Sequence, residues 1–530
     1  MLALLLALLL MGPFAALIQV ILGDSGGLWA HLFETVFPRY TANTLILMTG
    51  VAILSLSFGV VTAWIVARHS FFGVHILDWA LLLPATVPSY IIAYTYTDLL
   101  EFAGPIQSFL RQSFGWSSVR DYWFPEIRSM GGAMLVMSAV LYPYIYIMAR
   151  TAFRLTPASY IEVAQLSKLA SPINVDLLLA RPAIIAGLAL VLMEVLSDFG
   201  TVEFFAVETL TLGIFNIWLG MNNLTAAAQI AAVAFIFILV LLSMERWGRR
   251  HQRFFGESNR YSPLLSVKVR GRKAFGYFFI CIIPLILGFI IPVSILLSFV
   301  VKGYTNTNFD LLLSASIHSI LVALVTAGIV ISLATIMVSV TTFHENRNNL
   351  LKRLANVSVL GYAFPGVILA IGVVSFAGAI DKIFIMIEEK LFVMPFESFL
   401  IGSVGLLIFG CVVRFQAVGH GAIKSGVQRL SPNIVSASYV LGCSFSKSMV
   451  ILLSPLLRKS MLAGGMLVFV DVMKELPMTL LLRPFNYETL STYVYQFAKD
   501  ELLEETALAA LMIILVGIGP VILMHISQRK

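Results

Sequence analysis

Ionisable side chains are scarce in this chain of 530 residues, where Asp, Glu, Lys and Arg together make up 12%. Soluble domains carry roughly twice that share, so the composition excludes an ordinary soluble domain. The net charge of +7 follows the loops rather than one soluble face. We therefore expect no nucleic-acid partner.

Cysteine is also rare, and its three copies, Cys281, Cys411 and Cys443, are too far apart for a disulfide framework or a zinc-binding pattern. The histidines are scattered, with only His69 and His75 near each other, so we expect no metal site and no cofactor in this chain. No Gly-x-x-x-x-Gly-Lys-Ser/Thr phosphate loop occurs, so the chain cannot hydrolyse ATP by that route. With no catalytic cluster either, we do not expect an enzyme.

Hydrophobic residues make up 59% of the chain, and the mean hydropathy is +0.93. Apolar stretches of about 20 residues, which cross roughly 30 Å of hydrocarbon, recur along its length. A helix satisfies its own backbone hydrogen bonds in lipid, so we predict an all-α polytopic membrane protein with about 12 transmembrane helices. The expected spans are 3–22, 43–67, 76–99, 130–149, 182–200, 226–245, 275–299, 316–340, 356–378, 399–417, 459–476 and 505–525.

Lysine and arginine indicate how these spans are oriented. With the N-terminus inside, most of the 35 fall on cytoplasmic loops, and the densest cluster lies in the linker 248–274. Positive residues prefer the cytoplasmic side, so we expect both termini there. The apolar N-terminus has no positive n-region and no clear cleavage site, which favours a retained first span over a signal peptide.

The linker divides the chain into two similar halves, 1–247 and 275–530. The landmarks that match at offsets of 275 to 277 are Thr44 and Ser319, Pro88 and Pro365, Glu194 and Asp471, and Asp198 and Glu475. Each half holds six spans in the same orientation, because an even number of spans returns the chain to its starting side. We therefore predict two parallel six-span repeats around a pseudo-twofold axis along the membrane normal.

A long cytoplasmic loop follows the fourth span of each half, at about 150–181 and about 418–458. Pro157 and Pro432 each follow a Thr or Ser, which predicts a capped helix start with proline at the first helical position. A helix lying parallel to the membrane is either an ordinary interfacial element or a docking site for a partner. The residues alone leave both interpretations open.

These loops resemble the cytoplasmic loop of ABC importer permeases, where a Glu-Ala-Ala…Gly pattern marks the coupling helix that fits a groove on the ATPase. The matching positions are Glu162, Ala164 and Lys168 in "EVAQLSK", Ala437 and Gly442 in "SASYVLG", and Pro455 beyond it. Lys168 stands where the family has glycine, and Ser436 stands where it has glutamate. The resemblance implies a type I permease fold, two copies of a separate ABC ATPase that uses ATP and Mg, and a periplasmic solute-binding protein.

Two further stretches, "SDFGTVEFFAVETLTLGIFNIW" (197–218) and "KELPMTLLLRPFNYETLSTYVY" (474–495), resemble the fused ferric-iron importer permeases, in which one chain supplies both membrane domains. The resemblance covers nearly the whole chain apart from the first span and the linker. It implies a multi-pass permease of the bacterial inner membrane that imports ferric iron. Thiamine or another small solute is the alternative cargo.

Two carboxylates lie four positions apart near the end of the fifth span of each half: Glu194 and Asp198, then Asp471 and Glu475. This spacing places both members of a pair on one helix face. An ionised group costs roughly 2.5–3.5 kcal/mol at the centre of a bilayer, so such groups usually face a cavity, form pairs or lie near an interface.

Three interpretations of these acids are open. Gly200 and Pro477 follow almost at once, which predicts that the helices end there, so the acids are either solvated at the outer interface or paired locally by Lys474. In the third interpretation they line the translocation path, since ferric iron is a hard cation that prefers oxygen ligands. A diffuse anionic lining fits a permease better than a full coordination sphere, which would hold the ion too tightly for release.

A secondary transporter driven by an ion gradient is the competing class, because it too can consist of two parallel six-span halves. Its major facilitator group places a Gly- and Arg-rich signature in the loop that here reads "RHSFFGVH" (68–75), and that signature is lacking. In the importer interpretation, loops such as 101–129, 201–225 and 477–503 receive the cargo from the binding protein.

Overall fold

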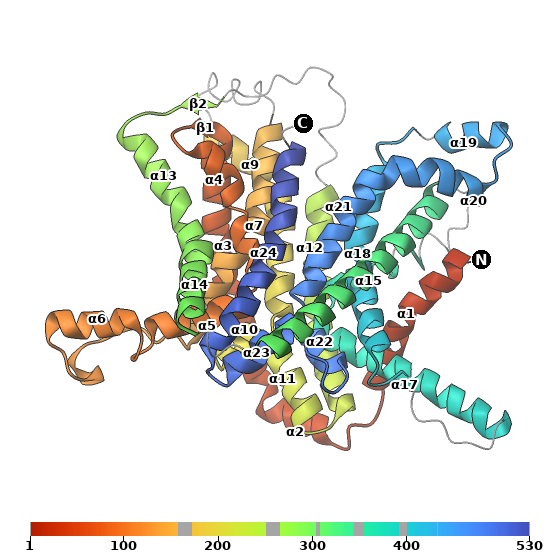
Figure 1. Ribbon diagram of the computed structural model, residues 1–530, viewed down its shortest axis with the longest axis horizontal. Helices are drawn as coiled ribbons and strands as arrows, with labels where there is room; N and C mark the ends of the chain where they lie inside the picture. The colour runs from red at the N-terminus through yellow and green to blue at the C-terminus, as the bar shows by residue number, and fades with distance from the viewer. Residues whose placement is uncertain are drawn as a thin grey trace. The chain divides into compact units, whose positions relative to one another are not determined.

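Helices make up nearly all of the computed structural model, which describes residues 2–156, 172–250, 266–303, 308–343, 354–355, 357–391, 400–431 and 433–528 (Figure 1). The only strands among these residues are β1 (His69–Ser70) and β2 (Val267–Lys268), a two-stranded parallel pair. The prediction of an all-α polytopic protein is confirmed.

The helical elements follow the expected spans with shifted boundaries. Those of the first half are α1 (Leu2–Ile21), α2 (Leu28–Thr35), α3 (Phe37–Arg68), α4 (Val74–Ala80), η1 (Leu83–Thr86), α5 (Ser89–Leu100), α6 (Pro105–Phe114), η2 (Val119–Asp121), α7 (Met130–Leu155), α9 (Pro172–Ser197), α10 (Gly200–Phe204), α11 (Leu210–Phe215), η3 (Asn216–Gly220) and α12 (Leu224–Arg250). Those of the second half are α13 (Arg272–Leu285), η5 (Ile286–Ile290), α14 (Ile291–Gly303), α15 (Phe309–Phe343), η6 (Leu360–Ala363), α17 (Gly366–Leu391), α18 (Val404–Val427), α19 (Asn433–Val440), α20 (Phe445–Ser448), η7 (Met449–Leu453), α21 (Ser454–Met473), α22 (Pro477–Leu482), α23 (Leu490–Lys499) and α24 (Leu503–Gln528).

Eleven helices in the described part of the chain are long and apolar enough to cross a membrane, or up to twelve if one bent pair counts as a span. That pair, Val74–Thr86 with Ser89–Phe114, is bent by 92° where a single span over 76–99 was expected. Pro88 explains the break, because proline has no N–H to donate and disfavours helical geometry in the residue before it. The predicted straight span is therefore wrong at this point.

Two boundaries in the second half also differ from the expectation. In the span predicted at 356–378, the long α-helix α17 begins at Gly366, after Pro365, and continues to Leu391. The span predicted to begin at 459 is part of a longer helical run, Phe445–Met473, which passes through the π-helical turn η7. Helical structure thus extends well into the second long loop.

The chain forms two compact units that each combine segments from both sequence halves. Unit 1 consists of Met1–His31, Ile214–Ala232 and Thr307–Gln496, and unit 2 consists of Leu32–Gly213, Val233–Asn306 and Phe497–Lys530. The first span therefore packs with helices of the second half, and α13, α14 and α24 pack with helices of the first. The repeat boundaries at 247 and 275 stay a prediction about the sequence.

Close helix packing holds each unit together. In unit 1, α1 approaches α17 so closely that a Cβ on Gly372 would lie 2.5 Å from the carbonyl oxygen of Pro13. In unit 2, Tyr142, Tyr146 and Phe153 on α7 are fully buried in one apolar cluster with side chains of α3 and α4. Deeply buried tyrosines of this kind fix the relative position of neighbouring spans by packing rather than by charge.

Candidate functional site

The most unusual polar region of unit 1 lies where α21 ends and α22 begins. Glu475 stands in the short connection between these helices, and its Oε1 accepts a hydrogen bond of 3.1 Å from the backbone N–H of Met478. The first N–H groups of a helix have no partner within the helix, and the positive end of the helix dipole favours an anion there. Glu475 therefore stabilises the start of α22.

Arg414, in the middle of α18, provides the opposite charge. Its Nη1 lies 3.4 Å from Oε1 of Glu475, and the two side chains are 8% and 6% exposed. Gly366 at the start of α17 leaves the space for this contact, since a Cβ there would lie 2.9 Å from the Glu475 Oε1 and closer still to Arg414. Removing one partner of an ion pair this deeply buried is strongly destabilising, because the other charge stays buried without compensation.

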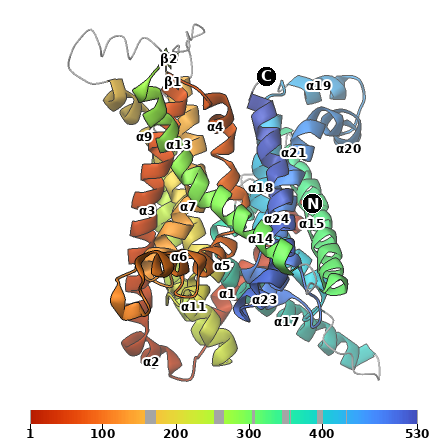
Figure 2. The same cartoon turned by 60° about the vertical axis from the view of Figure 1, so that its left-hand side comes forward.

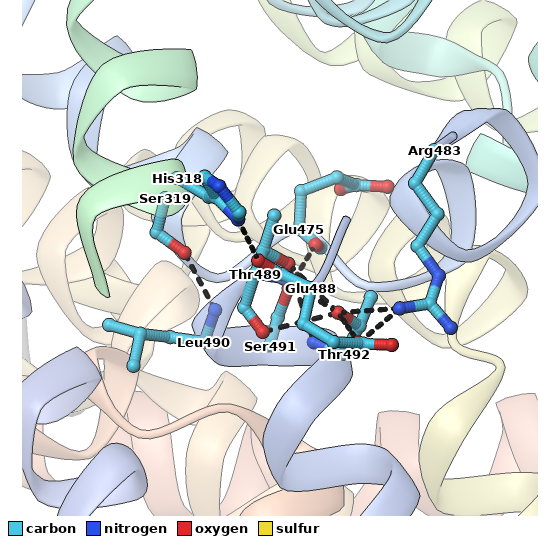
Figure 3. Close-up of polar contacts among 9 residues, drawn as sticks. All are labelled: His318, Ser319, Glu475, Arg483, Glu488, Thr489, Leu490, Ser491 and Thr492. Carbon is cyan, nitrogen blue, oxygen red and sulfur yellow. Dashed lines mark hydrogen bonds and ion pairs between the residues drawn. The ribbon is translucent and has the colours of Figure 1, made fainter. Parts of the chain in front are cut away.

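A network of backbone and hydroxyl contacts surrounds this connection (Figure 3). The carbonyl oxygen of Glu475 accepts hydrogen bonds from Thr479 Oγ1 at 3.0 Å and from Ser491 Oγ at 2.7 Å. At the start of α23, the Oγ1 of Thr492 donates to Glu488 Oε2 at 2.7 Å, and Arg483 forms an ion pair with the same carboxylate. The span end, α22 and α23 are thus fixed to one another.

Unit 2 contains the corresponding connection between α9 and α10, with Asp198 in place of Glu475. Its Oδ1 accepts hydrogen bonds from the backbone N–H groups of Thr201 at 2.9 Å and Val202 at 3.3 Å. Its Oδ2 accepts from the hydroxyls of Thr201 and of Ser89, the first residue of α5. Asp198 therefore caps α10 and also holds it against α5.

The two connections differ in how the acid is compensated. Glu475 faces a guanidinium group, whereas the partners of Asp198 among the described residues are hydroxyl and amide groups. The helix of unit 2 that matches α18 is α7, and its first basic residue is Arg150, which pairs with Asp78 instead. The negative charge of Asp198 is thus stabilised by dipoles and that of Glu475 by a cation.

A second pair of contacts recurs in the two units. Thr44 Oγ1 accepts a hydrogen bond of 3.0 Å from the backbone N–H of Leu210, and Ser319 Oγ accepts one of 2.6 Å from that of Leu490 (Figure 3). Ser319 lies 275 positions after Thr44, and Leu490 lies 280 positions after Leu210. The same interaction at nearly the same offset supports two repeats of one arrangement.

Side chains one position earlier extend this likeness. Asn43 Nδ2 donates to the carbonyl oxygen of Glu208 at 3.0 Å, and His318 Nδ1 lies 3.0 Å from that of Glu488. The long helices α3 and α15 therefore each hold the start of a short helix, α11 and α23, with two consecutive side chains. The sequence offset predicted the match of Thr44 with Ser319, but not what these residues do.

Replacing Ser319 with alanine is expected to destabilise unit 1 by about 1–3 kcal/mol, because the buried N–H of Leu490 loses its acceptor. Ser332→Ala on the same helix is the matched control, since Ser332 is exposed and donates only to the carbonyl of Gly328. Thermal unfolding of the purified protein in detergent measures both. Equal midpoints for the two variants would contradict the capping role.

Lys474 forms an ion pair with Asp471, with 2.9 Å between Nζ and Oδ1. Both side chains are half-buried, as is Glu194 on α9, one helical turn before Asp198. The structure thus gives Asp198 and Glu475 structural contacts and Asp471 a local ion partner. That the five residues line the translocation path stays a prediction.

Three further ion pairs lie at the other end of unit 2, beside the first long loop. Arg68, the last residue of α3, binds Asp176 on α9 through Nε at 2.8 Å and through Nη2, and the two side chains are 7% and 2% exposed. Trp64 Nε1 donates to the same carboxylate at 3.2 Å. The start of α9 is therefore fixed to the end of α3.

The other helix that borders this loop is held in a similar way. Near the end of α7, Arg150 and Arg154 lie 2.7 Å and 2.9 Å from Oδ1 of Asp78 on α4. Arg150 also donates to the carbonyl of Asp78 at 2.9 Å, and its side chain is 2% exposed. The ends of α7 and α9 that border residues 157–171 are thus held to α4 and α3 by buried ion pairs.

Sequence reasoning missed these ion pairs, although a signal was present. Arg414 interrupts the apolar span 399–417, and an ionisable residue within a span usually has a partner. The partners could not be named, because Arg68 and Asp176 are 108 positions apart and Arg150 and Asp78 are 72 apart. Only the packing of the helices brings them together.

Of the six predicted coupling residues, Glu162, Ala164 and Lys168 lie outside the described residues. Ala437 lies in α19, Gly442 lies just after it, and Pro455 lies in the first turn of α21. The short helices α19 and α20 are joined by a hydrogen bond of 2.7 Å between the hydroxyls of Ser438 and Ser448. The second long loop is therefore a folded element.

Gly442 ends α19 with a backbone that only glycine adopts easily. Its φ is +81°, and its N–H donates to the carbonyl of Tyr439 at 2.9 Å. This left-handed residue closes the helix in the manner of a common C-terminal cap. Next to it, Val440 and Leu441 are 88% and 83% exposed, so the helix end presents apolar side chains outward.

The structure is that of an all-α polytopic membrane protein, with long apolar helices, a break after the fifth span of each half and a folded second loop. In sequence the chain resembles the fused permeases of ABC importers. Over 504 residues, the chain is 24% identical to the Fe(3+)-transport system permease protein FbpB 2 of Haemophilus influenzae, covering 93% of this chain and 90% of the relative. No protein-family model matches the chain.

Two shorter relatives match about half of the chain each. The molybdenum transport system permease protein ModB of Haemophilus influenzae is 26% identical over 215 residues, 39% of this chain and 90% of ModB. The sulfate transport system permease protein CysT of Salmonella typhimurium is 29% identical over 261 residues, 46% of this chain and 90% of CysT. A single permease of that size therefore corresponds in length to one half of this chain.

Proposed function

We propose that this chain is the permease subunit of an ATP-driven importer and that its cargo is ferric iron. The observation that carries the proposal is the likeness to an iron-transport permease over 93% of this chain and 90% of the relative, which takes in both halves. The chain itself holds no cofactor in this proposal, and ATP and Mg bind to two copies of a separate ABC ATPase. A periplasmic solute-binding protein delivers the cargo, and both termini face the cytoplasm at the inner membrane.

Electrostatics favour a cation over the oxyanions that ModB and CysT are named for. Among the described residues, Asp198 has hydrogen-bond donors but no ion partner, so no cation lies beside the carboxyl group at the break in unit 2. A site that discriminates for sulfate or molybdate needs uncompensated donors or cations instead. A carboxyl group without a neighbouring cation therefore supports iron over an oxyanion.

Uptake by proteoliposomes tests this function directly. The chain is reconstituted with a candidate ABC ATPase and a candidate periplasmic binding protein from the same organism, and labelled ferric iron, molybdate, sulfate and thiamine are offered in turn. ATP-dependent uptake of iron alone is the expected result. Uptake of another solute would overturn the cargo, and uptake that needs a proton gradient but no ATP would identify a secondary transporter.

Gly442→Val is expected to reduce ATP-driven uptake strongly without preventing membrane insertion. A side chain in the left-handed region costs about 1–2 kcal/mol, which would reshape the end of α19 and move Val440 and Leu441. Gly421→Ala on α18 is the control, because a Cβ there meets nothing within 4 Å. Uptake at the wild-type rate in Gly442→Val would show that this helix end does not transmit ATP hydrolysis.

A further inference from the structure

The helix α6, which follows α5 in unit 2, has its polar and apolar faces in an unusual arrangement. Gln107, Ser108 and Arg111 lie on one side of the helix, and the opposite side carries Pro105, Ile106, Phe109 and Leu110 together with the polar Ser113. Phe114 is the last residue of the helix, and Gln112 and Ser113 are exposed. Such a division is typical of a helix that lies at a boundary between two media.

The polar face of α6 points into its own hairpin, formed with the returning segment up to Arg128. Gln107 Nε2 donates to the carbonyl of Leu100 at 2.7 Å, and its Oε1 accepts from the hydroxyl of Tyr122. Arg111 Nη1 donates to the carbonyl of Phe102 at 2.6 Å and to the Tyr122 hydroxyl at 3.1 Å. The hydrogen-bonding capacity of this face is thus used internally.

The apolar face points outward instead. Phe109 and Phe114 are 67% and 64% exposed, and Trp123 on the returning segment is 85% exposed. A surface helix in water shows the reverse arrangement, because exposed apolar area is unfavourable there. The hairpin therefore requires an apolar medium or partner on this face.

The position of α6 within unit 2 favours lipid as that medium. Figures 1 and 2 show α6 running across the direction of α3 and α7 and extending beyond them, at the level where α5 ends. An ion pair of 2.5 Å between Arg128 and Glu101 closes the base of the hairpin. α3 and α7 have the length and composition of membrane spans. Because α6 runs across their direction near one end, it lies at the level of the interfacial layer of the bilayer.

We propose that the hairpin 102–128 is a lateral membrane anchor that binds the interfacial layer of the leaflet at this end of the spans, the outer leaflet in the proposed orientation. Phe109 and Phe114 enter the acyl-chain boundary, to a depth of about 5–10 Å. Trp123 lies at the level of the headgroups, where tryptophan is enriched in membrane proteins.

The third span of the second half has a similar extension. In unit 1, α17 continues past Asp381 and projects beyond the neighbouring helices (Figure 1). Asp381 is buried and accepts hydrogen bonds from the backbone N–H groups of Leu400 and Ile401, while Ile383, Phe384 and Met386 are 52%, 58% and 55% exposed. A projecting arm with an apolar surface thus occurs once in each half, which supports a common role at the membrane.

A fluorescent probe at Phe109 tests the anchor. Phe109→Cys and Phe114→Cys are each labelled with an environment-sensitive dye in a Cys443→Ser background, because Cys281 and Cys411 are buried. In phosphatidylglycerol–phosphatidylcholine nanodiscs, we expect blue-shifted emission and several-fold stronger quenching by lipids spin-labelled on the acyl chain than by a water-soluble quencher. Arg120→Cys, at the exposed tip of the hairpin, is the control and should show the opposite preference.

Two outcomes would overturn the anchor. Aqueous emission at Phe109 and Phe114 in nanodiscs is one, and the other is protection of these positions only after the periplasmic binding protein is added, which would assign the face to a protein. If labelled variants do not insert, hydroxyl-radical footprinting of the unsubstituted chain decides, since Phe109 and Phe114 should be oxidised several-fold less in nanodiscs than in amphipathic polymer. Neither measurement depends on the cargo or on ATP, so the anchor and the proposed function can fail separately.

Discussion

Asp176→Ala is expected to lower the free energy of unfolding of unit 2 by about 3–5 kcal/mol, since it leaves the buried Arg68 guanidinium without its carboxylate. Arg68 donates hydrogen bonds from Nε and Nη2 to Asp176, and its side chain is only 7% exposed. The Trp64 indole N–H would lose its acceptor as well. Thermal unfolding in detergent or nanodiscs measures the loss.

Arg154→Gln is the matched control at the same end of the unit. Arg154 is 44% exposed, and Asp78 keeps the buried Arg150 when Arg154 is removed. Exposed ion pairs contribute roughly 0–1 kcal/mol, so this variant should unfold close to the wild type. A loss as large as that of Asp176→Ala would show that exposure does not decide the effect here.

A double replacement separates stability from coupling. Replacing Arg68 with methionine and Asp176 with leucine removes both charges, and such exchanges of buried pairs are often neutral for stability. We expect the double variant to regain most of the stability and still to import more slowly than the wild type. The ion pair joins α9, which leads out of the first long loop, to α3, and apolar contact is less directional.

The fold was largely accessible from the sequence because its main signal is hydrophobic length. Runs of about 20 apolar residues have one interpretation in a bilayer, and twelve windows led to the eleven or twelve spans observed. The breaks were harder to see, because Pro84 and Pro88 lie inside an apolar window that reads as a single span. The packing of α1 against helices of the second sequence half could not be predicted at all, since it depends on which helix surfaces fit together.

The candidate site was predictable in position but not in its contacts. The repeat offset identified Asp198 and Glu475 as counterparts, and Gly200 and Pro477 correctly marked the helix ends. The interaction of Glu475 with Arg414 required the distance between two helices separated by 61 positions in the chain. Local spacing suggested Lys474 as a partner for Asp471 or Glu475, and the structure shows its ion pair with Asp471, three positions earlier.

The second large expected effect is a difference between the two matched acids. Glu475→Gln removes the charge that the buried Arg414 faces and should destabilise unit 1 by about 3–5 kcal/mol. Asp198→Asn should cost less than about 1 kcal/mol, because an amide oxygen still accepts from the Thr201 and Val202 N–H groups. Its new amide donor can turn to the hydroxyls of Ser89 and Thr201, which are able to accept as well as donate. Thermal midpoints of the two single variants give the comparison.

Uptake by the same variants tests the predicted translocation path. Asp198→Asn keeps the helix cap and removes only the charge, so a loss of iron uptake without a loss of stability would support a role along the path. Asp198→Asn combined with Glu475→Gln is expected to abolish uptake while the chain still binds its ATPase. Normal uptake by a stable Asp198→Asn protein would instead limit this carboxylate to holding α10 against α5. In that case the negative charge at the break would be a property of the fold, and the choice of cargo would lie with the binding protein.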